Sequence, residues 1–148
     1  MLTHSVGVTR KFTAFASGAT GAPRTPAGDL LAPDHLSAVR SAGDAARRAW
    51  ATADLGRTCH LPFGTFPAQL AAGIALFDVL AHTWDVAVAL GIPIDAPDEM
   101  WDTGLAAARH VIGPDRDAAH YGPELPSSAA DPPAARFLRF LGRDPDRR

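Results

Sequence analysis

The sequence predicts an all-α protein whose helices pack as a bundle, with one short hairpin before the longest helix. Apolar residues recur at helical spacing in four long stretches, and the connections between these stretches are dense in Gly and Pro. Only residues 57–67 have the pattern of a strand pair. A chain of 148 residues can bury a core but is too short for two independent domains. We therefore expect a single domain over residues 1–148.

Two helices are expected in the first third of the chain. Residues 2–17 place apolar side chains near helical spacing, and Gly18 is a suitable stop. After a loop at 18–33, a second helix is expected from Asp34, its N-cap, to residue 54. The apolar positions of this second helix predict that its inner face consists of Leu36, Val39, Ala46, Trp50 and Ala53.

The hairpin and the longest helix follow. Residues 57–67 read RTCHLPFGTFP, which predicts a short extended pair that turns at Phe63-Gly64. Pro67 is well placed as the first residue of a helix over 67–90, and Gly91 ends that helix.

Two further helices complete the prediction. A helix over 97–112 begins with acidic residues, which suit a helix N-terminus, and a short helix over 134–141 ends at Gly142. The residues that the helix over 97–112 is expected to bury are Met100, Trp101, Leu105, Ala108 and Ile112.

Composition and charge exclude several classes of protein. The net charge is −2 and no basic cluster exceeds two consecutive arginines, so the chain has no footprint of a nucleic-acid or membrane-surface binder. Arg10 and Lys11 interrupt the N-terminal segment, which therefore lacks the apolar core of a signal peptide. No stretch reaches about 18 uninterrupted apolar residues. Cys59 is the single cysteine and is expected to fill apolar space. We expect a cytoplasmic protein.

A polar stripe on the longest helix is the main functional signal. Residues 77–85 read FDVLAHTWD, and residues 68–90 contain no Lys, Arg or Glu. Because residues three and four apart share a helix face, Asp78, His82 and Asp85 form one stripe between apolar flanks. A helix with such flanks is expected to be mostly buried, and buried carboxylates and imidazoles need a partner or a metal ion.

The spacing leaves two interpretations open. Asp78 and His82 can ligate one divalent ion, since carboxylate oxygen and imidazole nitrogen both bind zinc at about 2.0–2.2 Å. However, most Asp and His residues at this spacing form ordinary surface or hydrogen-bonded pairs. A third ligand would come from another helix, and His4 lies on an apolar-rich segment that must pack against the longest helix. The other histidines are expected to be solvated or peripheral: His35, His60, His110 and His120.

Three stretches carry a resemblance to a known family. They are HSVGVTRKFTAFASG (4–18), PFGTFPAQLAAGIALFDVLAHTWDVAVALG (62–91) and YGPELPSSAADPPAARFLRFLGRDP (121–145). Together they resemble the DinB/YfiT-like metalloprotein superfamily, and most closely its actinobacterial branch related to mycothiol-dependent maleylpyruvate isomerase. The HTWD segment and the terminal LGRDP are the more specific parts of the match.

The resemblance implies an up-down four-helix bundle that holds a divalent metal ion, often zinc. In the family one ligand is a His near the start of the second bundle helix, and the other two are an acidic-x-x-x-His pair on the fourth. These carry over to His4, Asp78 and His82. Glu is common in the family where this chain has Asp78. Asp85 lies outside the ligand pattern and is expected to orient His82 or to hold a neighbouring arginine.

The family normally has a whole helix before the helix that bears the His ligand, whereas this chain begins four residues from His4. The resemblance therefore implies a domain shortened at its N-terminus. Without that helix, apolar faces of the segments 2–17 and 67–90 would be uncovered. We expect either a start upstream of Met1 or a homodimer that covers them.

The resemblance implies a metal-dependent enzyme that acts with a low-molecular-weight thiol of the mycothiol type on an electrophilic substrate, by isomerisation or S-transfer. The ion would lower the pKa of a bound thiol or water. Arg10 and Lys11 could attract an anionic substrate or simply be solvated. The alternative is a non-catalytic metal-binding or interaction protein that retains the bundle, because one scaffold hosts many functions.

Overall fold

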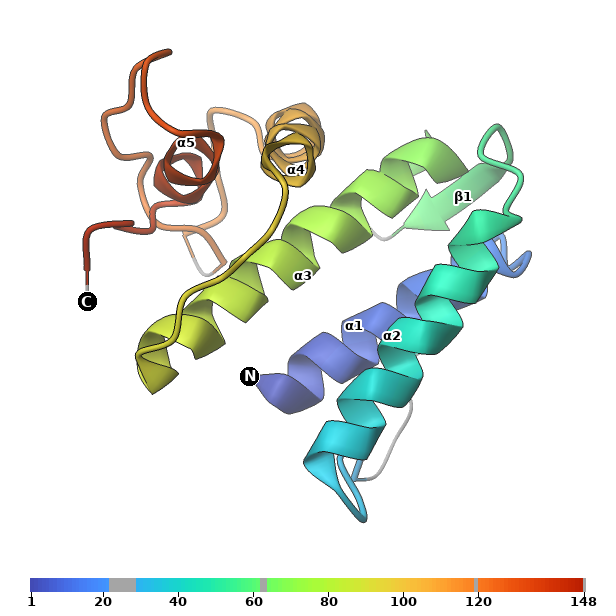
Figure 1. Cartoon of the computed structure of the whole chain (residues 1–148). Helices are drawn as coiled ribbons and strands as arrows, with labels where there is room; N and C mark the ends of the chain where they lie inside the picture. The colour runs from blue at the N-terminus through green and yellow to red at the C-terminus, as the bar shows by residue number, and fades with distance from the viewer. Residues whose placement is uncertain (22–28, 62–63, 119, 148) are drawn as a thin grey trace. The chain divides into compact units, whose positions relative to one another are not determined.

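The computed structural model describes residues 1–21, 29–61, 64–118 and 120–147 (Figure 1). It confirms that the protein is mostly helical with one small sheet. Its elements are α1 (Leu2–Ala16), α2 (His35–Ala51), β1 (Thr58–Leu61), β2 (Gly64–Pro67), α3 (Ala68–Leu90), α4 (Asp98–Val111) and α5 (Pro133–Phe140). Residues 22–28 of the expected loop at 18–33, and the turn residue Phe63, lie outside the described residues.

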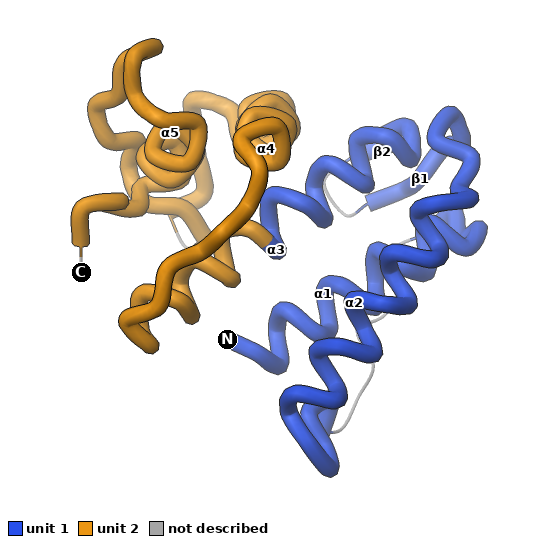
Figure 2. Tube along the Cα trace, in the orientation of Figure 1, with its two compact units in different colours: residues 1–79 blue, residues 80–148 orange. Residues whose placement is uncertain are grey.

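The chain forms two compact units, Met1–Val79 and Leu80–Arg148, whose boundary falls inside α3 (Figure 2). The single domain over 1–148 stays a prediction.

In the first unit α1 and α2 pack side by side (Figure 1). Asp34 caps α2 as expected, because its carboxylate accepts hydrogen bonds from the backbone N–H groups of Leu36 and Ser37. The predicted inner face of α2 is wrong in part. Ala38 and Ala42 are buried, whereas Leu36 and Val39 are exposed. Small side chains allow two helix backbones to approach closely, and this decides which side of α2 faces inward.

The hairpin lies between α2 and α3 in the chain, and the residue before it contacts both the end of α1 and the start of α3. β1 and β2 are antiparallel, and Thr58 is paired with Pro67. Pro67 therefore ends β2, and α3 begins one residue later than expected. The reason is that the backbone N–H of Ala68 donates to the Arg57 carbonyl at 2.7 Å, so the hairpin uses the first donor of the helix. The Arg57 guanidinium donates to the carbonyls of Phe15 and Ala16 and satisfies the C-terminal end of α1.

In the second unit α4 and α5 pack together around aromatic rings. The Trp101 and Phe137 ring centroids lie 5.4 Å apart. An added Cβ on Gly104 would lie 3.2 Å from Phe137, so the glycine allows this close packing. Of the residues expected to be buried by this helix, Met100 is exposed, and Ile112 is buried as the residue that caps the end of α4.

A glycine contact fixes the chain after α5. Gly142 has φ +77°, and a Cβ on it would lie 2.7 Å from the backbone of Gly122. The backbone N–H of Arg143 donates to the Leu138 carbonyl at 2.9 Å, which is the pattern of a helix closed by a left-handed glycine. The direction in which Arg143 leaves α5 is therefore set by backbone contacts.

The longest helix is less buried than its composition predicts. Ala71, Ile74 and Phe77 are buried, but most residues of α3 are half-buried or exposed, including Val79 and Leu90. Among the described helices, α3 is long and apolar enough to cross a membrane by length and composition, a test that the core helix of a water-soluble protein also passes.

Candidate metal centre

The polar stripe of α3 is half-buried. The side chains of Asp78, His82 and Asp85 are 20%, 23% and 18% exposed. Neighbouring apolar residues of the same helix, such as Phe77, Leu80 and Ala81, are buried. The three polar groups are thus partly withdrawn from water while they remain reachable by a small ligand.

His4 of α1 lies beside the first of these carboxylates. Its Nε2 is 3.7 Å from Oδ1 of Asp78, and both residues belong to the first compact unit. The His4 side chain is 57% exposed. This pair brings together two of the three ligands that the resemblance implies, from segments 74 residues apart in the sequence.

The third side chain comes from α3. The boundary between the compact units falls after Val79, but α3 continues without a break, so helix geometry places His82 one turn beyond Asp78. One ligand atom from each of His4, Asp78 and His82 lies within 4.8 Å of the others. Two zinc bonds of ~2.1 Å at a tetrahedral angle separate ligand atoms by about 3.4 Å. The three ligand atoms are therefore farther apart than in an occupied zinc site, but their chemical types suit a divalent ion.

Asp85 contacts both His82 and an arginine. Its Oδ2 lies 3.1 Å from Nδ1 of His82. Arg143 donates to both carboxylate oxygens, from Nε to Oδ1 at 2.8 Å and from Nη2 to Oδ2 at 2.8 Å. This is a bidentate pair, the arrangement in which a guanidinium holds a carboxylate most firmly.

These contacts decide the charge of Asp85. Burial of the carboxyl opposes its ionisation, but the hydrogen bonds and charges of Arg143 and His82 outweigh that effect and hold the pKa of Asp85 well below its ordinary value. Asp85 is therefore an anion at neutral pH and only accepts hydrogen bonds.

Two proteins of Mycobacterium tuberculosis are similar to this chain, the uncharacterized protein Rv0738 of strain H37Rv and the uncharacterized protein MT0763 of strain CDC 1551. Each is 32% identical over 145 residues, which cover 97% of this chain and 77% of the relative. The chain belongs to the family of these two proteins. No family model and no solved structure matches this Rv0738-family chain.

The other predicted residues of this Rv0738-family protein are distributed over several elements. Arg10 and Lys11 lie on α1 about two turns after His4, the first exposed and the second half-buried. The remaining histidines are all exposed, as expected: His35, His60, His110 and His120.

The sequence left two roles open for Asp85, to orient His82 or to hold a neighbouring arginine, and did not identify the arginine. The structure identifies Arg143. A signal was present, since Asp85 belongs to the HTWD segment and Arg143 to the terminal LGRDP, the two more specific parts of the resemblance. That these parts meet is a property of the second unit's fold.

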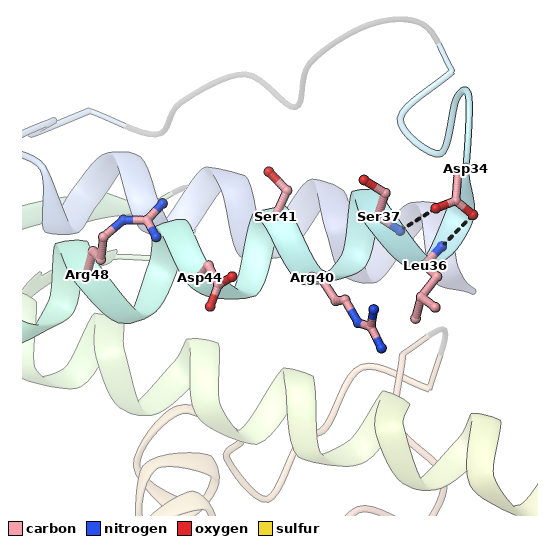
Figure 3. A pocket seen from close by; sticks show the side chains of 7 residues that line it. All are labelled: Asp34, Leu36, Ser37, Arg40, Ser41, Asp44 and Arg48. Atoms are coloured by element: carbon pink, nitrogen blue, oxygen red, sulfur yellow. Dashed lines mark hydrogen bonds between the residues drawn. The ribbon is translucent and has the colours of Figure 1, made fainter.

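An open depression lies elsewhere, along α2 (Figure 3). Its lining residues are Asp34, Leu36, Ser37, Arg40, Ser41, Asp44 and Arg48. All of them come from one helix and its N-cap, and Asp34 is already engaged in capping. The depression includes none of the candidate metal ligands.

Proposed function

We propose that this protein binds a divalent metal ion, zinc, through His4, Asp78 and His82. The observation that carries the proposal is the convergence of three ligand atoms within 4.8 Å. Two of these residues share a face of α3, and the third comes from α1, so the sequence spacing of the pair alone does not account for the cluster.

The donor set suits zinc. Two imidazoles and one carboxylate are a common set of protein ligands in catalytic zinc sites, which keep a further coordination position for water or substrate. The 57% exposure of His4 gives a small molecule access to that side of the cluster. A bound ion would lower the pKa of a thiol or water that occupied the remaining position.

The resemblance extends this proposal to a DinB-like bundle and to a reaction class. The protein would be a metal-dependent isomerase or S-transferase that uses a mycothiol-type thiol and an electrophilic substrate. Arg10 and Lys11, two turns along α1 from His4, would attract an anionic substrate by charge.

The second candidate is a metal-binding or interaction protein without catalysis. Asp78 favours it, because a shorter acid stands where the resembling family commonly has Glu. The two candidates share the metal site and differ only in turnover.

The first experiment measures zinc in the purified protein by mass spectrometry, for the wild type and His82→Ala. We expect about one zinc per chain in the wild type and almost none in the variant, because loss of a ligand weakens binding by at least about 100-fold, more than the loss of a supporting contact causes. His110→Ala is the matched control, because His110 is exposed on α4. A wild type without stoichiometric metal under zinc-replete conditions contradicts the proposal.

A second experiment separates the two candidates. The zinc-loaded protein is assayed for thiol-dependent turnover of candidate electrophiles, with His82→Ala as the blank. Turnover that requires both zinc and thiol supports the enzyme. Bound zinc without turnover over a broad electrophile panel supports the non-catalytic candidate.

Location and assembly complete the proposal. The protein would act in the cytoplasm as a homodimer, because exposed Leu36 and Val39 give α2 an uncovered apolar side in the described first unit. Light scattering tests the dimer directly, and a stable monomer at micromolar concentration contradicts it.

A further inference from the structure

We propose that Arg143 is a positioning residue for His82 and acts through Asp85. The Arg143–Asp85 pair holds the His82 ring with its proton on Nδ1, so that Nε2 is the atom with which His82 binds the metal. The functional role of this hydrogen-bonded series rests on the proposed metal site, but the effect of Arg143 on His82 can be measured without metal.

The hydrogen-bond geometry is the first support. Arg143 occupies both oxygens of Asp85 at 2.8 Å, which fixes the plane of the carboxylate. Oδ2 of that fixed carboxylate lies 3.1 Å from Nδ1 of His82. A carboxylate held by two parallel bonds cannot rotate away from the imidazole without breaking at least one of them.

The proton assignment follows from the chemistry of the partners. An ionised carboxylate is only an acceptor, so the short contact requires Nδ1 of a neutral His82 to carry the proton. A neutral imidazole with Nδ1 protonated has its lone pair on Nε2. Histidines that bind metals generally donate their other ring N–H to a carboxylate, carbonyl or water, which fixes the tautomer and orients the ring.

The second unit contains a pair for comparison. Arg139 donates to Asp131 at 2.6 Å, and their side chains are 22% and 26% exposed, close to the 19% and 18% of Arg143 and Asp85. Arg139 donates hydrogen bonds to two aspartates of the C-terminal segment, Asp131 and Asp146. Loss of either arginine removes an ion pair of similar exposure, but only loss of Arg143 acts on His82.

Backbone geometry supports a positioning role for Arg143. Gly142 closes α5 with φ +77° in contact with the backbone of Gly122, and Arg143 is the next residue. The backbone N–H of Arg143 donates a hydrogen bond to the carbonyl of Leu138 in α5. The guanidinium therefore starts from a fixed main chain, which reduces the conformational entropy lost when it holds Asp85.

The experiment compares Arg143→Gln, Arg143→Lys and the control Arg139→Gln with the wild type. The tautomer of His82 is read from long-range ¹⁵N–¹H spectra of the metal-free protein, at a pH where His82 is neutral. Zinc affinity is measured by chelator competition. In the wild type we expect the Nδ1–H form. In Arg143→Gln we expect a mixture with the Nε2–H form and zinc binding weaker by roughly tenfold, the low end of supporting-contact effects.

The lysine variant and the control complete the design. Arg143→Lys should give an intermediate result, because an ammonium keeps the charge but lacks the two-pronged fork. Arg139→Gln should leave both the tautomer and the zinc affinity at wild-type values. Equal effects of Arg139→Gln and Arg143→Gln would mean a general structural role and overturn the proposal.

The tautomer measurement keeps this proposal separate from the proposed function. If the wild type binds no zinc but shows an Nδ1–H form that is lost in Arg143→Gln, the proposed metal function is wrong. The positioning role of Arg143 is then still supported. An Nε2–H form of His82 in the wild type overturns the proposed positioning role of Arg143, whether or not zinc binds and whether or not the variants fold.

Discussion

Asp78 and Asp85 lie on the same helix, one before and one after His82, but their carboxylates have different partners. The side chains are similarly exposed, at 20% and 18%. Asp85 is held at 2.8 Å by both arms of a permanently charged guanidinium. Asp78 faces His4 at 3.7 Å, a group that is charged only when protonated.

The difference is consistent with a supporting role for Asp85 and with the ligand role that we propose for Asp78. A carboxylate already matched by a bidentate arginine is poorly suited to bind a metal, because binding would require exchange of strong charge-assisted hydrogen bonds. A carboxylate beside two imidazoles can accept a cation and satisfy its charge at the same time. The same residue type, seven positions apart, is therefore assigned to two roles by what faces it.

The largest change in zinc affinity is expected for substitutions of the two aspartates themselves. Asp78→Asn should weaken zinc binding by at least about 100-fold, since it removes a proposed ligand, whereas Asp85→Asn should weaken it by roughly 10–100-fold through His82. Zinc affinity is measured by chelator competition. A larger loss in Asp85→Asn would reverse the two roles.

The same two variants should rank oppositely in stability. In the metal-free protein, Asp85→Asn leaves the half-buried Arg143 without its charged partner and should cost about 1–3 kcal/mol of unfolding free energy. Asp78→Asn should cost less than about 1 kcal/mol, because its pair with exposed His4 is long and screened by solvent. Urea denaturation with chelator present gives both values, and equal losses would remove the contrast.

A substitution of Gly142 should disturb the contact of Arg143 with Asp85 and leave Asp78 unaffected. Gly142→Ala forces a Cβ onto a residue with φ +77° and to within 2.7 Å of Gly122, so we expect a loss of about 2–4 kcal/mol and a mixed His82 tautomer. Gly113→Ala is the matched control, since its added Cβ meets nothing within 4 Å. A tolerated Gly142→Ala would mean that the Gly122 segment moves easily and that Arg143 is not fixed by the backbone.

The smallest expected effect concerns the length of the ligand acid. The ligand atoms lie up to 4.8 Å apart, a longer separation than zinc coordination requires. One more methylene would extend the reach of the carboxylate. Asp78→Glu should tighten zinc binding by about three- to tenfold, or about 0.7–1.4 kcal/mol. Weaker binding would show that the α1–α3 spacing suits the shorter acid.

Much of the secondary structure could be predicted because it depends on neighbours in sequence. The extents of α1, α3 and α4 follow from helical periodicity, and Asp34 is an N-cap because its carboxylate reaches N–H groups two and three residues ahead. The shared face of Asp78, His82 and Asp85 is likewise a property of helix spacing alone. The wrong predictions concern which face of a helix is buried, because that depends on packing against other helices. Leu36 and Val39 were expected to face inward, but α1 packs on the alanine side of α2.

Helical spacing predicts that α3 carries a polar stripe between apolar flanks, and the family resemblance indicates His4 as a companion to that stripe. The contacts of His4 with Asp78, across 74 residues, and of Arg143 with Asp85, across 58, are visible only in the folded chain. Helices and caps are set by groups a few residues apart, whose geometry the backbone fixes. Contacts between distant residues depend on how whole elements pack. That packing decided which aspartate of α3 received the arginine and which faced the histidine of α1.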